Sequence, residues 1–414
     1  MTLLSQLFRE KVSSFKDFRM KNETEYNIGY PTGFLGFDFL NGTVVHVKSK
    51  DMDFTYNSVG IVDGSMVTVI GRTGCGKTTF ILQSASEIIR PFETSCIYHD
   101  DIEGGIVQTR KEMLLRMRGS ELKDHYIARN SGITAENFYE RIKMIHDLKM
   151  ENRSDYEYDT GVYDEEGNRV IKMEPTVYIL DSLALLMPEK YTDEEELSGQ
   201  MSTTAAAKTN SSIFRRIIPM LKAANIILFV VNHITEKVEV NMFAKTKAQT
   251  AYLKPGESLG GGRVATYVTN LLIRLDDNSK LKETEGFGVH GSIVELSILK
   301  SRTCAAGRSI NLVFDYDDGF DRDLSLLLLL KEQGIVVAKG AYMRFDGNDD
   351  IKFTQKAFKQ KLQEDQDFQK IFMEYAMKGL MEIITKPSEE VFEKNSKFDV
   401  TSSLLSIATS MSVA

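Results

Sequence analysis

The stretch from Gly71 to Thr79, which holds three glycines and ends in Lys77-Thr78-Thr79, constrains this chain more than any other. It follows the apolar run Met66 to Ile70 and precedes a helical pattern from Phe80 to Ile89, which Pro91 closes. Strand, glycine-rich turn and helix form the context in which the pattern G-x-x-x-x-G-K-[ST] binds phosphate. The predicted phosphate-binding residues are Gly71, Arg72, Thr73, Gly74, Cys75, Gly76, Lys77, Thr78 and Thr79.

Each part of this loop has a physical role. Glycines let successive backbone N–H groups turn inward around a phosphate chain, and the helix N-terminus adds its positive end. We expect Lys77 to reach the β- and γ-phosphates and the Thr78 hydroxyl to ligate Mg²⁺. Cys75 is interpreted as a filler of the loop without a redox role. The alternative is a glycine turn that matches a short pattern by chance.

Length and composition limit the possible domain organisation and location of the protein. Its 414 residues exceed the usual limit for a single core, so we expect a large central domain with smaller appendages. Cys75, Cys96 and Cys304 lie far apart without a paired metal spacing, which argues against zinc and disulfides and favours a reducing, cytoplasmic location. The longest apolar run, Leu324 to Leu330, is too short to cross a bilayer, so no membrane association is expected.

The charges are segregated along the chain. The net charge of −8, from 51 basic and 59 acidic residues, by itself argues against nucleic acid. Contact with phosphates, however, needs only a local basic surface. The segment from Lys208 to Lys222 carries bases and no acid, whereas residues 151–175 are acidic. The local distribution therefore leaves a nucleic-acid partner open.

Apolar runs at 95–99, 176–181 and 225–233 alternate with helical patterns, which predicts an α/β fold with a doubly wound, mostly parallel sheet. Further strands are expected at 268–275, 292–300 and 310–316. Residues 151–175 resemble a surface hairpin that turns at Glu166 to Asn168. Two polar loops, 187–203 and 234–263, are long enough to suggest function.

We predict four parts: an N-terminal helix and linker at 1–28, a core at 29–320, a small helical domain at 321–387, and a flexible tail at 388–414. The helix within the first 21 residues is amphipathic, so its apolar stripe must dock on its own core or on a neighbouring subunit.

Transfer of a phosphoryl group to water needs a phosphate cradle, a metal, a base and a cation. Asp181 ends a buried strand and would complete the metal site with Thr78. Glu103 follows the strand expected beside the phosphate loop and is the candidate base, unless it is a solvated acid that caps the next helix. Asn232 and His233 end another strand, where they could sense the γ-phosphate, although a lone histidine is more often structural.

In this order the features resemble the RecA-type recombinases. The matching segments are the phosphate loop, Asp101-Ile102-Glu103, Leu180-Asp181-Ser182, Asn232-His233 and Gly260-Gly261-Gly262-Arg263. The likeness covers roughly residues 25–345. It implies a RecA-like P-loop ATPase core that uses ATP and Mg²⁺, with Glu103 activating the attacking water. It also implies that the N-terminal helix packs on the adjacent protomer.

The resemblance assigns two more groups of residues. Leu299 to Ala306 looks like the family segment whose basic residues reach the neighbouring subunit's ATP site, so Lys300 and Arg302 become candidate catalytic residues acting in trans, and Tyr316 a candidate adenine or ribose contact. The two polar loops correspond to the family's DNA-binding loops. Candidate DNA contacts in and near them are Lys208, Lys237, Lys245, Lys247, Lys254, Gly261, Gly262 and Arg263.

Two departures point to a phage source. Cellular members usually have glutamine where His233 stands, whereas phage UvsX-type members have histidine, and the acidic segment 151–175 is unlike the cellular form. A phage-encoded recombinase, acting in the host cytoplasm, is therefore the nearer likeness.

The expected function is ATP-dependent strand exchange between single-stranded and double-stranded DNA by a helical filament. A single-strand-binding protein and a loading mediator are candidate partners. A hexameric replicative helicase and a non-catalytic recombination mediator are the alternatives.

Overall fold

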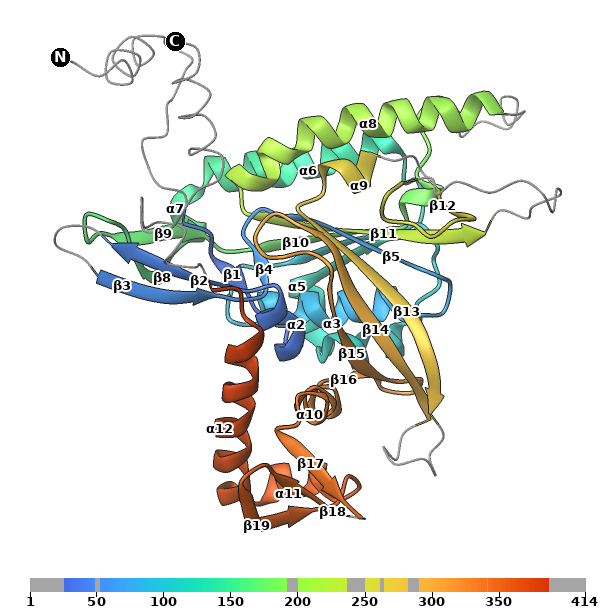
Figure 1. Cartoon of the computed structure of the whole chain (residues 1–414). Helices are drawn as coiled ribbons and strands as arrows, with labels where there is room; N and C mark the ends of the chain where they lie inside the picture. The colour runs from blue at the N-terminus through green and yellow to red at the C-terminus, as the bar shows by residue number, and fades with distance from the viewer. Residues whose placement is uncertain are drawn as a thin grey trace, which may run out of the picture.

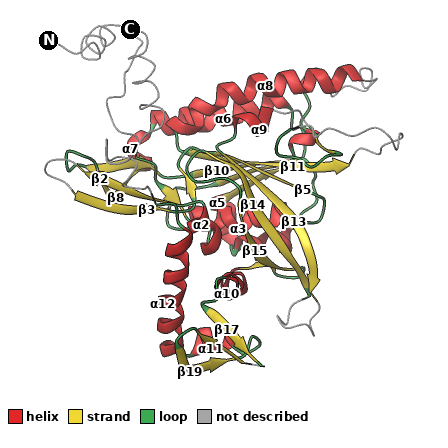
Figure 2. Ribbon diagram, viewed as in Figure 1, coloured by secondary structure: helices red, strands yellow, loops and turns green. Residues whose placement is uncertain are grey.

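The computed structural model describes residues 26–48, 53–191, 200–236, 250–260, 264–281, 290–340 and 342–386. The predicted N-terminal helix, the tail from residue 388 and the middle parts of both polar loops lie outside this range. A ten-stranded sheet with helices on both faces forms the centre of the described chain (Figures 1 and 2).

The sheet has the strand order β16-β15-β14-β13-β5-β11-β10-β6-β7, and β12 pairs with β11. Its strands are β5 (Met66–Gly71), β6 (Ile97–Asp101), β7 (Tyr126–Arg129), β10 (Thr176–Asp181), β11 (Ile226–Glu236), β12 (Glu257–Leu259), β13 (Leu271–Leu281), β14 (Gly291–Ser301), β15 (Arg308–Asp315) and β16 (Gly319–Asp321). Pairing is parallel from β13 through β5, β11, β10 and β6 to β7, and antiparallel from β13 to β16. The predicted mostly parallel α/β sheet is confirmed.

Alternate side chains of the central strands face opposite layers because the strand period is two. Val67 and Val69 of β5 join a core with α3 (Lys77–Ile89), whereas Met66 joins a core with α6 (Ala135–Glu151) and α8 (Gln200–Ala223). In Figure 1, α6, α8 and α9 (Val264–Val268) lie on one face of the sheet and α3 on the other. Burial on both faces explains why these strands read as continuous apolar runs.

The strand order corrects one expectation. β6, which leads to Glu103, does not lie beside the phosphate-loop strand, because β11 and β10 stand between β5 and β6. The chain segment that includes α3 carries β6 away from β5, and strands that come later in the sequence fill the two positions. Only tertiary pairing decides this order.

Short strands and hairpins flank the sheet at the end drawn near β2 in Figure 1. β2 (Thr43–Lys48) pairs with β3 (Asp53–Ser58), and β1 (Gly29–Tyr30) pairs with β4 (Ile61–Val62). The acidic segment forms the predicted hairpin from β8 (Glu157–Tyr163) and β9 (Arg169–Met173). It is attached to the core through Tyr158, whose hydroxyl lies 2.8 Å from that of Tyr30, and through a 2.8 Å ion pair between Lys172 and Asp63.

The remaining helices before the C-terminal part are short: α2 (Leu35–Leu40), α4 (Gln108–Leu115), α5 (Gly119–His125), α7 (Arg153–Tyr156), and the 3-10 turns at Leu183–Leu185 and Glu189–Tyr191. None of the helices in the described ranges is long and apolar enough to span a membrane.

The C-terminal part contains more strand than the sequence indicated. Helices α10 (Arg322–Glu332), α11 (Phe358–Glu364) and α12 (Gln366–Ile383) accompany a three-stranded antiparallel sheet of β17 (Val336–Lys339), β18 (Tyr342–Phe345) and β19 (Asn348–Phe353). The sequence predicted a helical domain for residues 321–387, so this sheet corrects that expectation. The apolar core of this part is continuous with that of α3, since Leu327 and Phe345 belong to the same cluster as Phe80.

The polar loops are more regular at their ends than expected. Residues 200–203 begin α8, residues 234–236 continue β11, and residues 257–259 form β12 against it. Within 250–260, Glu257 is buried and ion-paired, which a sequence without periodicity does not reveal.

Candidate nucleotide site

The phosphate loop has the predicted strand–turn–helix geometry between β5 and α3. Gly74 and Gly76 adopt φ values of 84° and 82°, a left-handed conformation that glycine accepts without a Cβ penalty. A Cβ built on Gly76 would lie 2.8 Å from Cε2 of Phe320, so the loop rests directly on that ring. No atom of the described part of the chain lies within 4 Å of a Cβ built at Gly74, so these residues leave that side of the loop open.

Lys77 folds back over the loop. Its Nζ donates hydrogen bonds to the carbonyl oxygens of Gly71 (3.1 Å) and Arg72 (2.8 Å). Burial lowers the pKa of Lys77. Cys75 is 2% exposed and burial raises its pKa, consistent with the filler role predicted for it.

Thr78 and Asp181 come together as predicted for a metal site, with Thr78 Oγ1 donating a 2.6 Å hydrogen bond to Asp181 Oδ2. The other oxygen, Asp181 Oδ1, is buried and has no hydrogen-bond partner among the described residues. Burial raises the pKa of Asp181 to about 6. An unpartnered buried carboxylate oxygen beside a hydroxyl suits a hard divalent cation with oxygen ligands, so the residues present fit Mg²⁺.

Glu103 and His233 meet across the carboxyl edge of the sheet. His233 Nε2 lies 2.6 Å from Glu103 Oε1, and ligand atoms of both residues lie within 4.8 Å of one on Asp181. The side chain of Asn232 is fixed nearby, because its Nδ2 donates to the carbonyl oxygen of Gly260 at 3.0 Å. Although β10 separates β6 from β11, Glu103, which follows β6, lies close to Asp181 of β10 and His233 of β11 at one edge beside Thr78.

Lys300 and Arg302 lie at the opposite edge of the sheet from the phosphate loop of their own chain. Ser301 pairs with Leu271, which pairs with Val67 near the start of β5, whereas Gly71 at its end pairs with Leu275. The Nζ of Lys300 donates to the carbonyl oxygens of Thr266 (3.2 Å) and Tyr267 (2.6 Å), and Arg302 is exposed. This position excludes contact with the nucleotide site of the same chain.

Tyr316 lies on the phosphate-loop side of the sheet. It follows β15, whose last residue, Asp315, pairs with Gly291. The Tyr316 ring packs edge-on against Phe314, with centroids 5.7 Å apart, and a Cβ at Gly76 would lie 3.3 Å from Phe314. The ring is 38% exposed, so one side remains accessible.

Two of the candidate DNA contacts fall within the described residues. Lys208 is exposed on α8, and Lys254 is exposed with its Nζ 3.5 Å from Asp276 Oδ2. The others, Lys237, Lys245, Lys247, Gly261, Gly262 and Arg263, lie outside the described residues.

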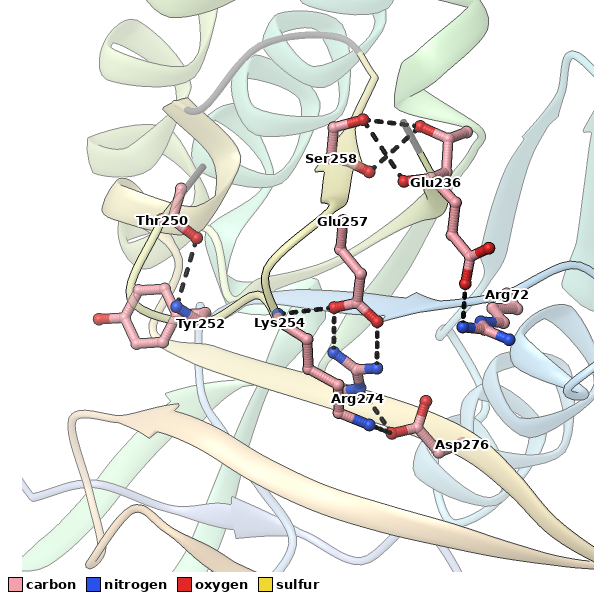
Figure 3. Close-up of polar contacts among 10 residues, drawn as sticks. Arg72, Glu236, Thr250, Tyr252, Lys254, Glu257, Ser258, Arg274 and Asp276 are labelled. Carbon is pink, nitrogen blue, oxygen red and sulfur yellow. Dashed lines mark hydrogen bonds and ion pairs between the residues drawn. The ribbon is translucent and has the colours of Figure 1, made fainter. Parts of the chain in front are cut away.

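Sequence reasoning missed an ionic network around the phosphate-loop strand (Figure 3). Arg274 of β13 makes a bidentate pair with Glu257 at 2.7 and 2.8 Å, and its Nε contacts Asp276 at 2.6 Å. Arg72 in the phosphate loop pairs with Glu236 at the end of β11. A single arginine inside an apolar strand pattern was the available signal for the first pair, but its partner lies 17 residues away.

A parallel sheet with a glycine-rich loop between a strand and a helix, and an acid at the end of a neighbouring strand, defines a P-loop nucleotide-binding core. Among such proteins, the chain is similar to RecA of Pseudomonas putida, with 28% identity over 172 residues (42% of this chain, 44% of that protein). It is also similar to RecA of Heliobacterium modesticaldum, with 22% identity over 307 residues (74% and 75%). The recombination and repair protein of Enterobacteria phage T4 is 29% identical over 164 residues (40% and 38%).

The resemblance to RecA-type recombinases, a phage recombination protein among them, is thereby confirmed, and the core is RecA-like. The alignments with the RecA proteins of Pseudomonas putida and Geobacter sulfurreducens span less than half the length of each. No family model matches the chain.

Proposed function

We propose that this protein is a DNA-dependent ATPase that forms helical filaments on single-stranded DNA and catalyses homologous pairing and strand exchange with double-stranded DNA. The observation that carries the proposal is the convergence of Lys77, Thr78, Asp181, Glu103 and His233 at one edge of a RecA-like core. The similarity to RecA proteins and to a phage recombination protein supports the DNA part.

In this proposal the phosphate loop binds ATP. Lys77 leaves the carbonyl oxygens of Gly71 and Arg72 and turns to the β- and γ-phosphates, while the loop N–H groups hold the phosphate chain. Thr78 and Asp181 hold Mg²⁺, which when bound would neutralise phosphate charge. Tyr316 supplies an aromatic surface for the adenine or ribose.

Glu103 is proposed to activate the attacking water. Its carboxylate accepts a proton as the water oxygen attacks the γ-phosphorus and the bond to the bridging oxygen of ADP breaks. In the structure Glu103 is hydrogen-bonded to His233. We propose that the γ-phosphate draws His233 away, which frees Glu103 and shifts the end of β11.

Lys300 and Arg302 are proposed to serve the nucleotide of an adjacent subunit. They lie at the opposite sheet edge from their own phosphate loop, so a head-to-tail assembly brings them to the next site. Such a heterologous interface that does not close produces a helical filament. An amphipathic helix in residues 1–28 would join the same interface.

DNA is proposed to bind along the two polar loops through Lys208, Lys254 and the loop residues outside the described range. Residues 29–320 would act as the core, 321–387 as an appended domain and 388–414 as a tail. A cytoplasmic location, and a single-strand-binding protein and a loading mediator as partners, belong to the same proposal.

A strand-exchange assay with ATP and matched circular and linear DNA tests the function. The wild type should convert substrate to joint and nicked products, and Lys77→Ala should not. Electron microscopy with single-stranded DNA and a nonhydrolysable ATP analogue should show open filaments. Closed rings would indicate a hexameric helicase, and ATP-dependent DNA binding without strand exchange would indicate a mediator.

A further inference from the structure

The end of β11 and strand β12 form a ribbon in which two acids face each other. Glu236 and Glu257 are directly paired across these antiparallel strands. Like charges in that position repel unless each has its own cation. Arg274 neutralises Glu257 and Arg72 neutralises Glu236, and Figure 3 shows the two carboxylates pointing toward these arginines. The ribbon end therefore depends on both arginines.

The two ion pairs differ in how readily they exchange partners. The side chains of Arg274 and Glu257 are 6% and 4% exposed, whereas those of Arg72 and Glu236 are 62% and 64% exposed. Breaking the buried pair would leave an uncompensated charge in the interior, so it is fixed. The exposed pair is weak and open to competition. At this end of the ribbon the β12 strand is thus anchored through Glu257, whereas the β11 strand is releasable at Glu236.

Arg72 also lies where a competing anion would arrive. It directly follows Gly71 in the phosphate loop, and its carbonyl oxygen is one of the two carbonyl acceptors that hold Lys77. Guanidinium groups pair with phosphate oxygens as readily as with carboxylates. Entry of a phosphate chain therefore gives Arg72 a second partner and removes Lys77 from the Arg72 backbone.

We propose that Arg72 and Glu236 are positioning residues that report occupancy of the phosphate loop to the end of β11. In the structure Arg72 pairs with Glu236. With nucleotide, Arg72 turns to the phosphates, Glu236 faces Glu257 uncompensated, and residues 234–236 separate from β12 while Arg274 retains Glu257. The inference rests on the proposed nucleotide binding and adds a route independent of the Glu103–His233 contact.

Nucleotide affinity provides the first test, measured by titration with ADP and with a nonhydrolysable ATP analogue. Because Glu236 competes for Arg72, Glu236→Gln should tighten binding about twofold to fivefold, the range of an exposed ion pair. Arg72→Gln should weaken binding, and adding Glu236→Gln to it should change nothing further. Glu295→Gln, which removes an acid on β14 outside this network, is the matched control and should bind as the wild type does. Unchanged or weaker binding by Glu236→Gln would overturn the proposal.

Hydrogen exchange of the amides of residues 234–236 provides a readout that affinity alone does not give. In the wild type, the nonhydrolysable analogue should speed this exchange, and in Arg72→Gln the exchange should already be fast and should not respond. Slower or unchanged exchange in the wild type would overturn the proposed role of Arg72 and Glu236. If the exchange result is negative while the wild type binds nucleotide and Lys77→Ala does not, only the proposed role of Arg72 and Glu236 is wrong. If the wild type binds no nucleotide, the proposed function fails as well.

Discussion

Nε2 of His233 and Oε1 of Glu103 lie 2.6 Å apart, although 130 residues and two strand positions separate them. In the proposed mechanism this contact would occupy the Glu103 carboxylate until another group engages His233. It also gives a reason for histidine at this position, because both ring nitrogens can take part in hydrogen bonds.

Glu103→Gln should abolish most ATP hydrolysis while nucleotide binding remains. The amide cannot accept a proton from the attacking water, so the rate should fall about 100- to 10,000-fold. Single-turnover hydrolysis with single-stranded DNA measures the effect, and titration with ADP verifies binding. Hydrolysis at the wild-type rate would remove Glu103 from the mechanism.

A mixture of two inactive variants should recover activity if Lys300 and Arg302 act in trans. Lys77→Ala has intact basic residues, and the double variant Lys300→Ala/Arg302→Ala has an intact phosphate loop. Random one-to-one filaments would contain productive contacts at about a quarter of the interfaces, since each interface takes one side from each neighbour. DNA-stimulated ATPase activity of the mixture is the measurement. A mixture as inactive as its components would show that the two basic residues do not complement a neighbouring site.

Lys149 should make the stability of the fold depend on alkaline pH. Its Nζ is buried and donates to the carbonyl oxygen of Glu174 at 2.7 Å, and burial lowers its pKa to about 7 from 10.5. Between these values the unfolded chain binds more protons than the folded one, so the Lys149 contribution to stability rises with pH from about 7 to 10.5. The slope should approach about 1.4 kcal/mol per pH unit.

Denaturant unfolding at pH 7, 8 and 9 tests this slope. Lys149→Met should lose the rise, whereas Lys143→Met, an exposed lysine on the same helix, should keep it. Parallel slopes in Lys149→Met and the wild type would mean that Lys149 is charged in the fold throughout.

Asn225 should matter for stability because it joins three elements from a strained position. Its φ is 47°, its Oδ1 accepts from the Gly64 N–H at 3.0 Å, and its Nδ2 donates to the Tyr30 hydroxyl (2.7 Å) and the Met173 carbonyl (2.6 Å). Asn225→Ala should cost about 3 kcal/mol of unfolding free energy, roughly 1 kcal/mol per lost hydrogen bond. Asn225→Gly relieves the backbone and loses the same bonds, so it should cost less than alanine. Equal stability of all three proteins in urea would contradict this role.

Local sequence patterns predicted a large part of the structure. The phosphate loop, the hairpin at 151–175 and the buried strands that contain Asp181 and His233 are encoded within short stretches, because turn chemistry and strand period are local properties. Thr78 lies at the end of the phosphate loop after β5, and Asp181 ends β10, so the sequence likewise placed both side chains at the carboxyl edge of a parallel sheet.

Short stretches of the sequence were enough to predict the phosphate loop, the parallel sheet and the positions of Glu103 and Asp181 at its carboxyl edge. Each of these features depends on residues that are close together in the chain. Only the tertiary structure decided that β10 and β11 stand between the strands of Gly71 and Glu103, and that His233 reaches Glu103 across that gap. It alone placed Lys300 at the far edge of the sheet and gave Glu236 and Glu257 separate arginines. Strand order and long-range ion pairs arise from how distant segments compete to bury apolar faces and compensate charge, and no local pattern encodes the outcome.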